Sequence, residues 1–220
     1  MTQLELIELV QQHHPTMGTV EIRTRLNRAQ NDFCARTELM KKTYRQLTSP
    51  GQRYYSLDSD ILKVLKVQLD DILVPRLIGD PIIDDDEWDG DAGRSDAGSG
   101  STNWYWYISN NRIGIVESGS ITISNKTSDF ISITTEKELR LFTISQATDF
   151  GTALTQESDL PVQFREGLAH RVIADGYLRG EINPQLHQIF MQKYEIMLKE
   201  GKKYARSNFQ QDGVIKPTDY

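Results

Sequence analysis

Hydrophobic residues recur every three to four positions at both ends of the chain, a spacing typical of helices that bury one face. The first such segment begins with the capping box Thr2-Gln3-Leu4-Glu5 and predicts a short helix that His13-His14-Pro15 ends. A longer helix is expected to follow, with Thr19 as its cap. Its apolar stripe has Cys34 beside it and consists of Ile22, Leu26, Ala29 and Phe33.

The same helical spacing returns in the last third of the chain. Asp159, followed by Leu160-Pro161, and Asn183, followed by Pro184, are each expected to cap a helix, because proline is tolerated in the first turn. Gly180 is expected to end the first of these helices, and the second is expected over residues 184–207. The predicted inward-facing residues are Phe164, Leu168, Val172, Tyr177, Leu186, Ile189, Phe190, Tyr194, Met197 and Leu198.

The middle of the chain changes to short runs of alternating residues separated by turn residues, which predicts antiparallel strands. We expect three pairs of strands, turning at Ser49-Pro50-Gly51, Asp70-Asp71 and Asn110-Asn111. Further strands are expected in 120–124, 130–135 and 138–144. The predicted fold class is therefore α+β, with residues 1–38 and 159–207 forming a helical bundle, residues 39–158 a β-rich insertion, and residues 208–220 an extended tail.

Charge is concentrated in one segment of this β-rich insertion. The chain has 220 residues and a net charge of −6, yet residues 80–101 alone carry eight acidic residues and one arginine. The rest of the chain therefore has a net charge of +1. Because the segment is also rich in Gly and Ser, we expect a long, solvated acidic loop. The N-terminus has no signal-peptide pattern, and no apolar run is long enough to span a membrane.

The acidic loop and one helix contain the candidate metal ligands. An EF-hand-like count of loop positions places oxygen ligands for calcium at Asp85, Glu87, Asp89, Asp91 and Asp96, although the usual final Glu and flanking helices are missing. Glu166 and His170 lie four residues apart on one helix face, which fits half a metal site or a surface ion pair. No complete metal set and no nucleophile–base pair can be assembled, so we expect neither a cofactor nor an enzyme.

Two further segments could bind a partner. The last helix carries a net charge of +3 over residues 184–207, which fits a nucleic-acid surface or simply cations that the helix dipole stabilises. In the strand 104–107, alternation puts Trp104 and Trp106 on one face and the two tyrosines on the other. This strand could be a platform for sugars or bases, or a strand packed on both faces or at a subunit interface.

The order of these parts resembles the portal adaptor proteins of tailed double-stranded DNA phages, also called head-completion or head–tail connector proteins. The resemblance rests on the helix segment LNRAQNDFCART, the segment YYSLDSDILKVLKVQLDD, the LRLFTI-like strand and, above all, the run LPVQFREGLAHRVIADGYLRG followed by a long basic helix. It covers nearly the whole chain through patterns of spacing, without a catalytic signature. The acidic loop is longer and more charged than the pattern needs.

This resemblance implies a structural protein of the virion neck, assembled in the host cytoplasm. Such adaptors form a ring, usually of twelve copies, that joins the portal protein to a tail or nozzle protein, and double-stranded DNA passes through without specific binding. The resemblance implies a portal-facing part in 184–220, with candidate contacts Tyr194, Lys199, Lys202, Lys203, Tyr204, Arg206, Phe209 and Tyr220. It implies a tail-facing part in loops within 98–135, with candidate contacts Trp104, Trp106, Asn110, Asn111 and Arg112.

Two alternatives remain open at this point. The protein could be another phage neck or tail-completion ring protein, or it could be a module that binds carbohydrate or a host surface through the Trp/Tyr strand. A near-neutral body argues against a protein that holds DNA tightly, because each neutralised phosphate would add salt-dependent affinity.

Overall fold

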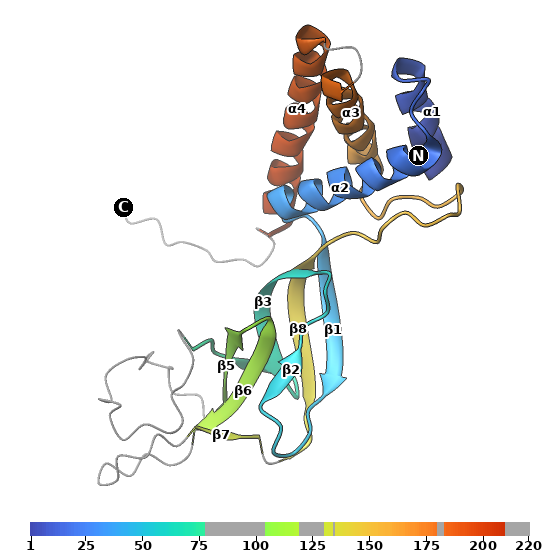
Figure 1. Ribbon diagram of the computed structural model, residues 1–220. Helices are drawn as coiled ribbons and strands as arrows, with labels where there is room; N and C mark the ends of the chain where they lie inside the picture. Colours follow the sequence, from blue (N-terminus) through green and yellow to red (C-terminus); the bar gives the residue numbers. More distant parts are fainter. Residues whose placement is uncertain (78–103, 119–129, 134, 180–182, 210–220) are drawn as a thin grey trace, which may run out of the picture. The chain divides into compact units, whose positions relative to one another are not determined.

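The computed structural model describes residues 1–77, 104–118, 130–133, 135–179 and 183–209 (Figure 1). The chain divides into two compact units, one formed by Met1–Lys41 and Ile144–Tyr220 and the other by Lys42–Thr143. The first unit is helical and the second contains antiparallel strands, so the predicted α+β class is confirmed. The division falls between residues 143 and 144, whereas the sequence placed it between 158 and 159.

The described residues of the helical unit form four helices: α1 (Gln3–His13), α2 (Thr19–Thr37), α3 (Val162–Arg179) and α4 (Pro184–Phe209). Helix α1 begins as predicted, since the Thr2 side chain accepts a hydrogen bond from the Glu5 amide and the Glu5 carboxylate accepts one from the Thr2 amide. Buried side chains from all four helices form one hydrophobic cluster. Segments from the two ends of the chain therefore share a single core.

The predicted stripe of α2 is confirmed, because Ile22, Leu26, Ala29, Phe33 and the neighbouring Cys34 are all buried in the shared cluster. The start of the helix differs from the prediction. Gly18 is the N-cap and makes no side-chain hydrogen bond, so Thr19 is the first helical residue rather than the cap. The helix ends where Glu38 adopts a left-handed conformation with φ of 52°.

Helix α4 begins as predicted at Asn183-Pro184, and the Asn183 side chain accepts a hydrogen bond of 3.2 Å from the Leu186 amide. The predicted Asp159 cap is wrong, because α3 begins at Val162, three residues further along the chain, and the Asp159 carboxylate accepts a hydrogen bond of 2.8 Å from the Thr148 amide. The predicted helix end at Gly180 lies outside the described residues. Most of the predicted inward-facing residues are buried or partly buried, as expected.

Ile189 is the exception among these residues, with 48% of its surface exposed. At 100° per residue it lies about 140° around α4 from Tyr194, which marks the centre of the buried face. Its neighbour Phe190 lies much closer to that centre and is 8% exposed. The predicted apolar stripe of α4 therefore included one residue, Ile189, that lies outside the buried face.

Residues 146–158 pack on the helices and do not continue the β region as expected. Ala147 and Phe150 belong to the cluster shared by the helices. The amide of Gln3 in α1 donates a hydrogen bond of 2.8 Å to the Gln156 carbonyl, and the Gln30 side chain in α2 donates one of 2.8 Å to the Thr148 carbonyl. These long-range contacts place the segment in the helical unit.

The described part of the second unit forms two sheets. In one sheet the strand order is β1 (Lys41–Leu47), β8 (Glu138–Ser145), β3 (Ile61–Leu69) and β4 (Ile72–Val74). In the other, β6 (Arg112–Ser118) pairs with β2 (Tyr54–Ser56), β5 (Trp104–Ser109) and β7 (Phe130–Ser132). Side chains from both sheets, including Tyr55, Val67, Ile115 and Leu139, form one hydrophobic cluster.

Two of the three predicted strand pairs are confirmed. The turn residues Asp70 and Asp71 connect antiparallel β3 and β4, and Asn110 and Asn111 connect antiparallel β5 and β6. All four have positive φ, from 46° to 67°, which Asn and Asp tolerate and two-residue hairpin turns require. The predicted pairing of 40–48 with 52–57 is wrong, because β1 lies beside β8 and β2 pairs with β6. The predicted strand 120–124 and acidic loop 80–101 lie outside the described residues.

Candidate partner-binding surfaces

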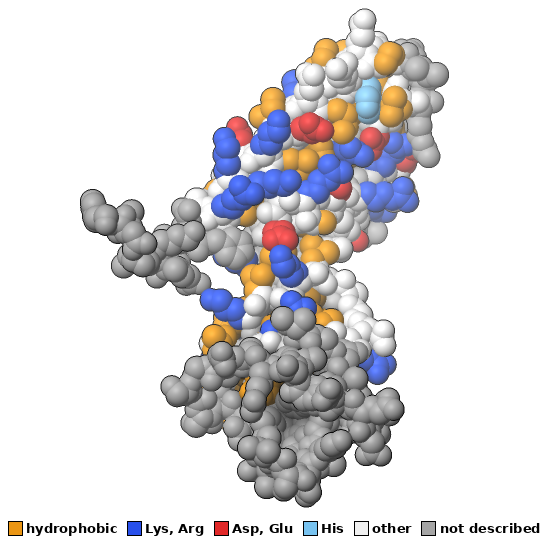
Figure 2. All heavy atoms as spheres, turned by 90° about the vertical axis from the view of Figure 1, so that its left-hand side faces the viewer, with side chains coloured by type: hydrophobic (Ala, Val, Ile, Leu, Met, Phe, Trp, Pro, Cys, Tyr) orange, Lys and Arg blue, Asp and Glu red, His pale blue; other side chains and the backbone are white. Residues whose placement is uncertain are grey.

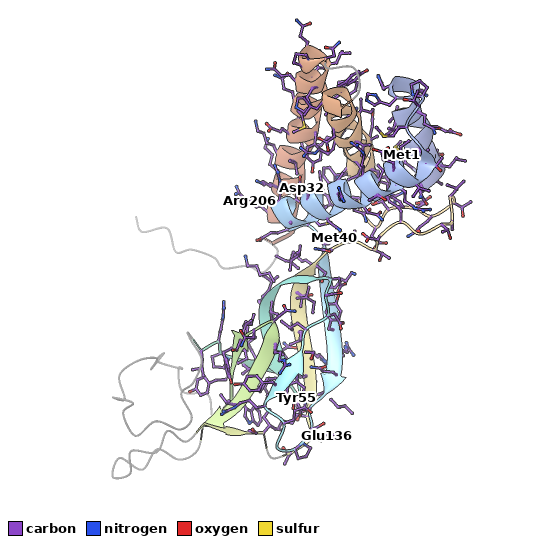
Figure 3. The ribbon with its side chains drawn as sticks, in the orientation of Figure 1. Met1, Asp32, Met40, Tyr55, Glu136 and Arg206 are labelled. Atoms are coloured by element: carbon purple, nitrogen blue, oxygen red, sulfur yellow. The ribbon has the colours of Figure 1, made fainter. Side chains whose placement is uncertain are left out.

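The C-terminal half of α4 presents a cluster of exposed cations. Lys199, Lys202, Lys203 and Arg206 are all exposed, and Arg206 extends from the end of this helix (Figure 3). The sequence of α4 contains two acidic residues, Glu195 and Glu200, which carry the opposite charge. In Figure 2, Lys and Arg side chains gather across the helical unit, with acidic side chains between them. Cations in the last turns of a helix are stabilised by the helix dipole. The position of these side chains therefore favours helix stability, and their charges remain exposed to a partner.

Tyr194 does not belong to this exposed surface, although the sequence placed it there. It is fully buried, and its hydroxyl donates a hydrogen bond of 2.9 Å to Oδ2 of Asp32 in α2. Burial raises the pKa of Tyr194, and the Asp32 carboxylate raises it further. The Arg171 guanidinium lies 5.7 Å from the centre of the ring. Tyr194 thus joins α4 to α2 inside the unit.

Tyr204 is partly exposed and partly packed against the helical core. It is 39% exposed, and its ring meets the Phe164 ring edge-on with centroids 5.8 Å apart. Part of the ring is therefore packed while part of it borders the α4 cations. Phe209 is the last residue of α4, but its side chain and the whole of Tyr220 lie outside the described residues.

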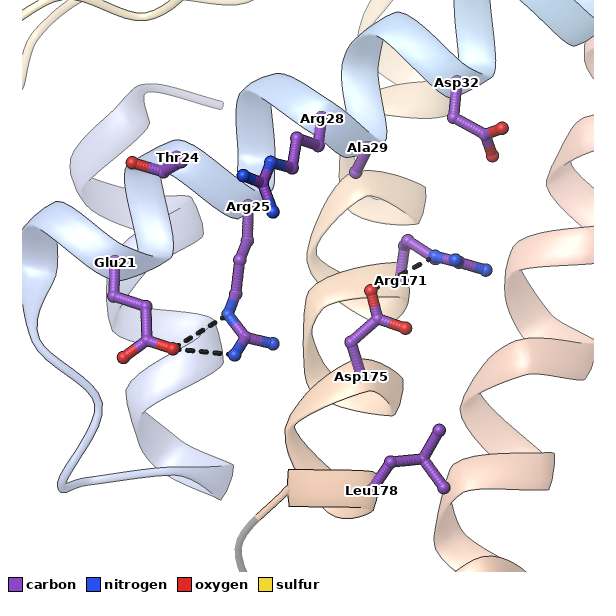
Figure 4. Close-up of a pocket in the computed structure, with 9 residues that line it drawn as sticks. All are labelled: Glu21, Thr24, Arg25, Arg28, Ala29, Asp32, Arg171, Asp175 and Leu178. Carbon is purple, nitrogen blue, oxygen red and sulfur yellow. Dashed lines mark hydrogen bonds and ion pairs between the residues drawn. The ribbon is translucent and has the colours of Figure 1, made fainter.

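A hollow of about 820 Å³ lies between α2 and α3 and was not predicted from the sequence (Figure 4). Its charges are largely paired along each helix. The Arg25 guanidinium lies 2.7 Å from Oε1 of Glu21, and Arg171 lies 3.4 Å from Asp175. The remaining lining residues are Thr24, Arg28, Ala29, Asp32 and Leu178. The sequence did show arginines outside the apolar stripe of α2, but nothing in it indicated which helix would face them.

The Trp/Tyr strand alternates as predicted. Trp104 and Trp106 belong to the cluster between the sheets, while Tyr105 and Tyr107 pack in a separate cluster on the other face. Trp106 is 3% exposed and Tyr107 is 1% exposed, so these two rings have no open face for a sugar or base. Cations cover the two tryptophans, since the side chain of Lys137 lies 4.5 Å from the Trp104 ring centre and that of Arg76 lies 5.2 Å from the Trp106 ring centre.

The exposed part of this hairpin is its tip. Asn110, Asn111 and Arg112 are all exposed at the turn between β5 and β6. Ile108, beside the turn, is 37% exposed. Of the five predicted tail-facing residues, the three at the tip are therefore available for contact, whereas Trp106 is buried and Trp104 is partly buried.

Comparison with known proteins adds one decisive observation. Residues 1–213 match the SU10 adaptor protein family. The chain belongs to this family. The SU10 adaptor family is a phage adaptor family, and membership implies a structural component of the virion that contacts other phage head or tail proteins. No curated protein matches the sequence.

This SU10 adaptor family member has no group of three His, Cys, Asp or Glu side chains placed to hold a metal ion within its described residues. His170 Nε2 lies 3.5 Å from Oε1 of Glu166, which fits the ion-pair interpretation of these two residues. Burial lowers the pKa of His170, and the Glu166 carboxylate acts in the opposite direction. The calcium candidates Asp85, Glu87, Asp89, Asp91 and Asp96 lie outside the described residues. In the described part of the chain no helix is long and apolar enough to cross a membrane.

Proposed function

We propose that this SU10 adaptor family member is a portal adaptor of the virion neck, in which a ring of copies joins the portal protein to a tail or nozzle protein. The family match over residues 1–213 carries this proposal. The expected copy number is twelve, and the ring forms part of the conduit through which double-stranded DNA passes. The largely paired charges of the hollow between α2 and α3 fit such a conduit wall, because paired charges hold phosphates weakly.

The portal contact in this proposal is the cationic C-terminal half of α4. Lys199, Lys202, Lys203 and Arg206 supply exposed charge, and Tyr204 supplies a half-exposed ring beside them. Phe209 and Tyr220, in the segment 208–220, extend this contact. A long cationic helix end suits a partner with an acidic surface, since complementary charge accelerates and orients docking.

The tail contact is the tip of the β5–β6 hairpin, formed by Asn110, Asn111 and Arg112. A short turn with two residues at positive φ holds this tip in one conformation, so little conformational entropy is lost on binding. Trp104 and Trp106 contribute indirectly, because they anchor β5 in the core behind the tip. The buried rings give no support to the alternative of a carbohydrate platform on this strand. A different neck or tail-completion ring remains the competing assignment within the virion.

Cryo-electron microscopy of assembled particles tests the assignment. The proposal requires density for this fold between the portal and the tail, with α4 directed toward the portal. Density for the fold elsewhere in the neck, or only at the distal end of the tail, would establish the competing assignment.

A binding experiment tests the portal contact separately. Replacing Lys199, Lys202, Lys203 and Arg206 by Gln is expected to weaken binding to purified portal protein at least ~10-fold at low salt and less at high salt. Arg28→Gln, which removes an exposed cation from α2, is the matched control and should bind normally. Deletion of residues 208–220 is also expected to weaken binding. Undiminished binding by both altered forms would remove α4 and the tail from the proposed contact.

A further inference from the structure

The four histidines of the chain all lie where α1 and α4 pack against α3. His13 and His14 end α1, His170 lies on α3 and His187 lies near the start of α4. Together with Tyr177 of α3 and Phe190 of α4 they form what we call the histidine cluster. The His13 ring centre is 4.9 Å from that of Phe190, and the His170 ring centre is 5.8 Å from it.

Two of the histidines make hydrogen bonds that do not depend on protonation. His14 Nε2 donates a bond of 2.9 Å to the Ile173 carbonyl, and His187 Nδ1 donates one of 2.9 Å to the Ala174 carbonyl. A neutral and a charged imidazole can both supply such a donor. These two bonds connect α3 to the C-terminal end of α1 and to α4.

The His14 contact is also very close. A Cβ atom at Gly176 would lie 2.5 Å from Cδ2 of His14, and still closer to Nε2. The His14 ring therefore lies directly on the backbone of α3, where only glycine leaves enough room. This part of the cluster tolerates little displacement of α1.

His13 and His170 are the members whose charge would disturb the cluster. The groups facing His13 are His14 on its own helix, the Tyr177 hydroxyl 3.2 Å from Nδ1, and Lys193 on α4. The groups facing His170 are Glu166 on its own helix, His13 on α1, and Lys193 on α4. Lys193 itself lies with Nζ 5.0 Å from the centre of the Phe190 ring. Protonation of His13 and His170 would thus add positive charges around Lys193. The Glu166 carboxylate would offset part of the charge on His170.

The pKa directions agree with this geometry. The His13 side chain is exposed, but desolvation where it contacts the protein lowers its pKa, and the nearby His14 and Lys193 lower it further. Burial likewise lowers the pKa of His170; Glu166 opposes this effect, while Lys193 and His13 add to it. The docked form of α1 therefore holds fewer protons than a released form. Docking is then strongest above the ordinary histidine pKa of about 6.5 and weakens as the pH falls below it.

We propose that the histidine cluster makes the docking of α1 on α3 and α4 sensitive to pH, so that mild acid releases α1 while the rest of the fold persists. Release would uncover Leu6, Ile7 and Val10, which are at most 2% exposed in the docked form. These side chains form the apolar face of α1 and pack into the core shared by the four helices. Acidification would thereby expose an apolar surface at the N-terminal end of the chain.

Hydrogen exchange on the full chain at pH 7.5, 6.5 and 5.5 tests this proposal. After correction for the intrinsic effect of pH on exchange, the α1 amides are expected to exchange ~5-fold or more faster at pH 5.5 than at pH 7.5. The α2 and α3 amides and the β5–β6 hairpin should change less than ~2-fold over the same range. Unchanged exchange in α1 would overturn the proposal. An equal acceleration in α1 and α2 would also overturn it, since that result indicates unfolding of the whole helical unit.

Lys193→Met provides the discriminating variant, with Lys199→Met as its matched control on the same helix. Removing the Lys193 charge is expected to ease protonation of His13 and His170 and so reduce the acid response of α1. Lys199→Met should respond as the unaltered chain does. Nuclear magnetic resonance of the four imidazole rings supplies a second readout, with midpoints for His13 and His170 expected below ~6.5. Identical responses of the two variants, or midpoints at or above that value, would refute the proposal.

Discussion

Gly114 in β6 is the position where a single added methyl group should disturb the β unit most clearly. It lies directly opposite Tyr107 of β5 in the antiparallel register. A Cβ atom built on Gly114 would lie 2.6 Å from Cε1 and 2.8 Å from Cε2 of Tyr107, and closer still to Cζ. The tyrosine ring therefore covers the glycine backbone, and the absence of a side chain at 114 makes that position of the ring possible.

The expected magnitude follows from this overlap. Carbon atoms that are not bonded pack at about 3.5–4.0 Å, so the ring must move by more than ~1 Å to admit a methyl group. Tyr107 is only 1% exposed and packs in a cluster with Leu77 and Val116, which leaves it little room. Overpacking of this kind destabilises by about 1–3 kcal/mol. Alanine recovers about 0.5–1 kcal/mol through lower backbone entropy in the unfolded chain. The net loss for Gly114→Ala should therefore be about 1 kcal/mol and at most about 2.5 kcal/mol.

Thermal and denaturant unfolding followed by tryptophan fluorescence would measure this loss. Trp104 and Trp106 lie on the same strand as Tyr107 and so report on the β unit. For a unit of about 100 residues, each kcal/mol corresponds to about 4–8 °C in the midpoint temperature.

A double-mutant cycle tests whether the clash with the Tyr107 ring causes the loss of stability in Gly114→Ala. Tyr107→Leu alone should destabilise the unit, because it removes a buried ring. In the Gly114→Ala background the same change should be less harmful by about 1 kcal/mol, since the smaller side chain leaves room for the methyl group. If the two single effects simply add, the clash with Tyr107 is not the source of the loss and the reasoning is refuted.

Three further predictions concern single residues, two through a polar contact and one through a turn conformation. Tyr194→Phe removes the hydrogen bond to Asp32 and should destabilise the helical unit by about 1 kcal/mol, measured by circular dichroism at 222 nm during denaturation. Burial acts to raise the pKa of Asp60, but hydrogen bonds from Tyr44 and Lys42 outweigh it and the net shift is downward. The β unit should therefore lose stability as the pH falls through that lowered pKa, and Asp60→Asn should flatten the dependence of the urea midpoint on pH below about 4. Asn111→Gly should stabilise the hairpin by about 0.5 kcal/mol, because residue 111 has φ of 60°, whereas Asn111→Ala should destabilise it.

Local patterns in the sequence were sufficient to predict the elements whose causes are themselves local. The capping box at Thr2, the start of α4 at Asn183 and the turns at 70–71 and 110–111 each depend on residues within four positions of one another. The alternation of Trp106 and Tyr107 between two faces follows from strand geometry alone. Exposed cations on α4 were also predictable, because charged residues on a helix rarely lie buried.

Strand partners and buried polar contacts depended on information that local patterns do not contain. A short apolar segment such as β1 or β2 can pair with any strand of similar pattern, and its neighbours in the structure, β8 and β6, come from distant parts of the chain. The hollow between α2 and α3 and the burial of Tyr194 both follow from how the helices cross, which the periodicity of one helix does not specify.

The misplaced boundary between the two units has a specific physical origin in two polar side chains of α2. The Asn27 side chain accepts a hydrogen bond of 2.9 Å from the Phe150 amide, and the Gln30 side chain donates one of 2.8 Å to the Thr148 carbonyl. Both residues are polar and lie next to the apolar stripe, so their sequence pattern is that of a solvated helix face. In the structure they satisfy the backbone of an extended segment that forms neither helix nor strand there. Because a buried amide and an exposed amide give the same sequence signal, residues 146–158 could be assigned to the helical unit only from tertiary contacts.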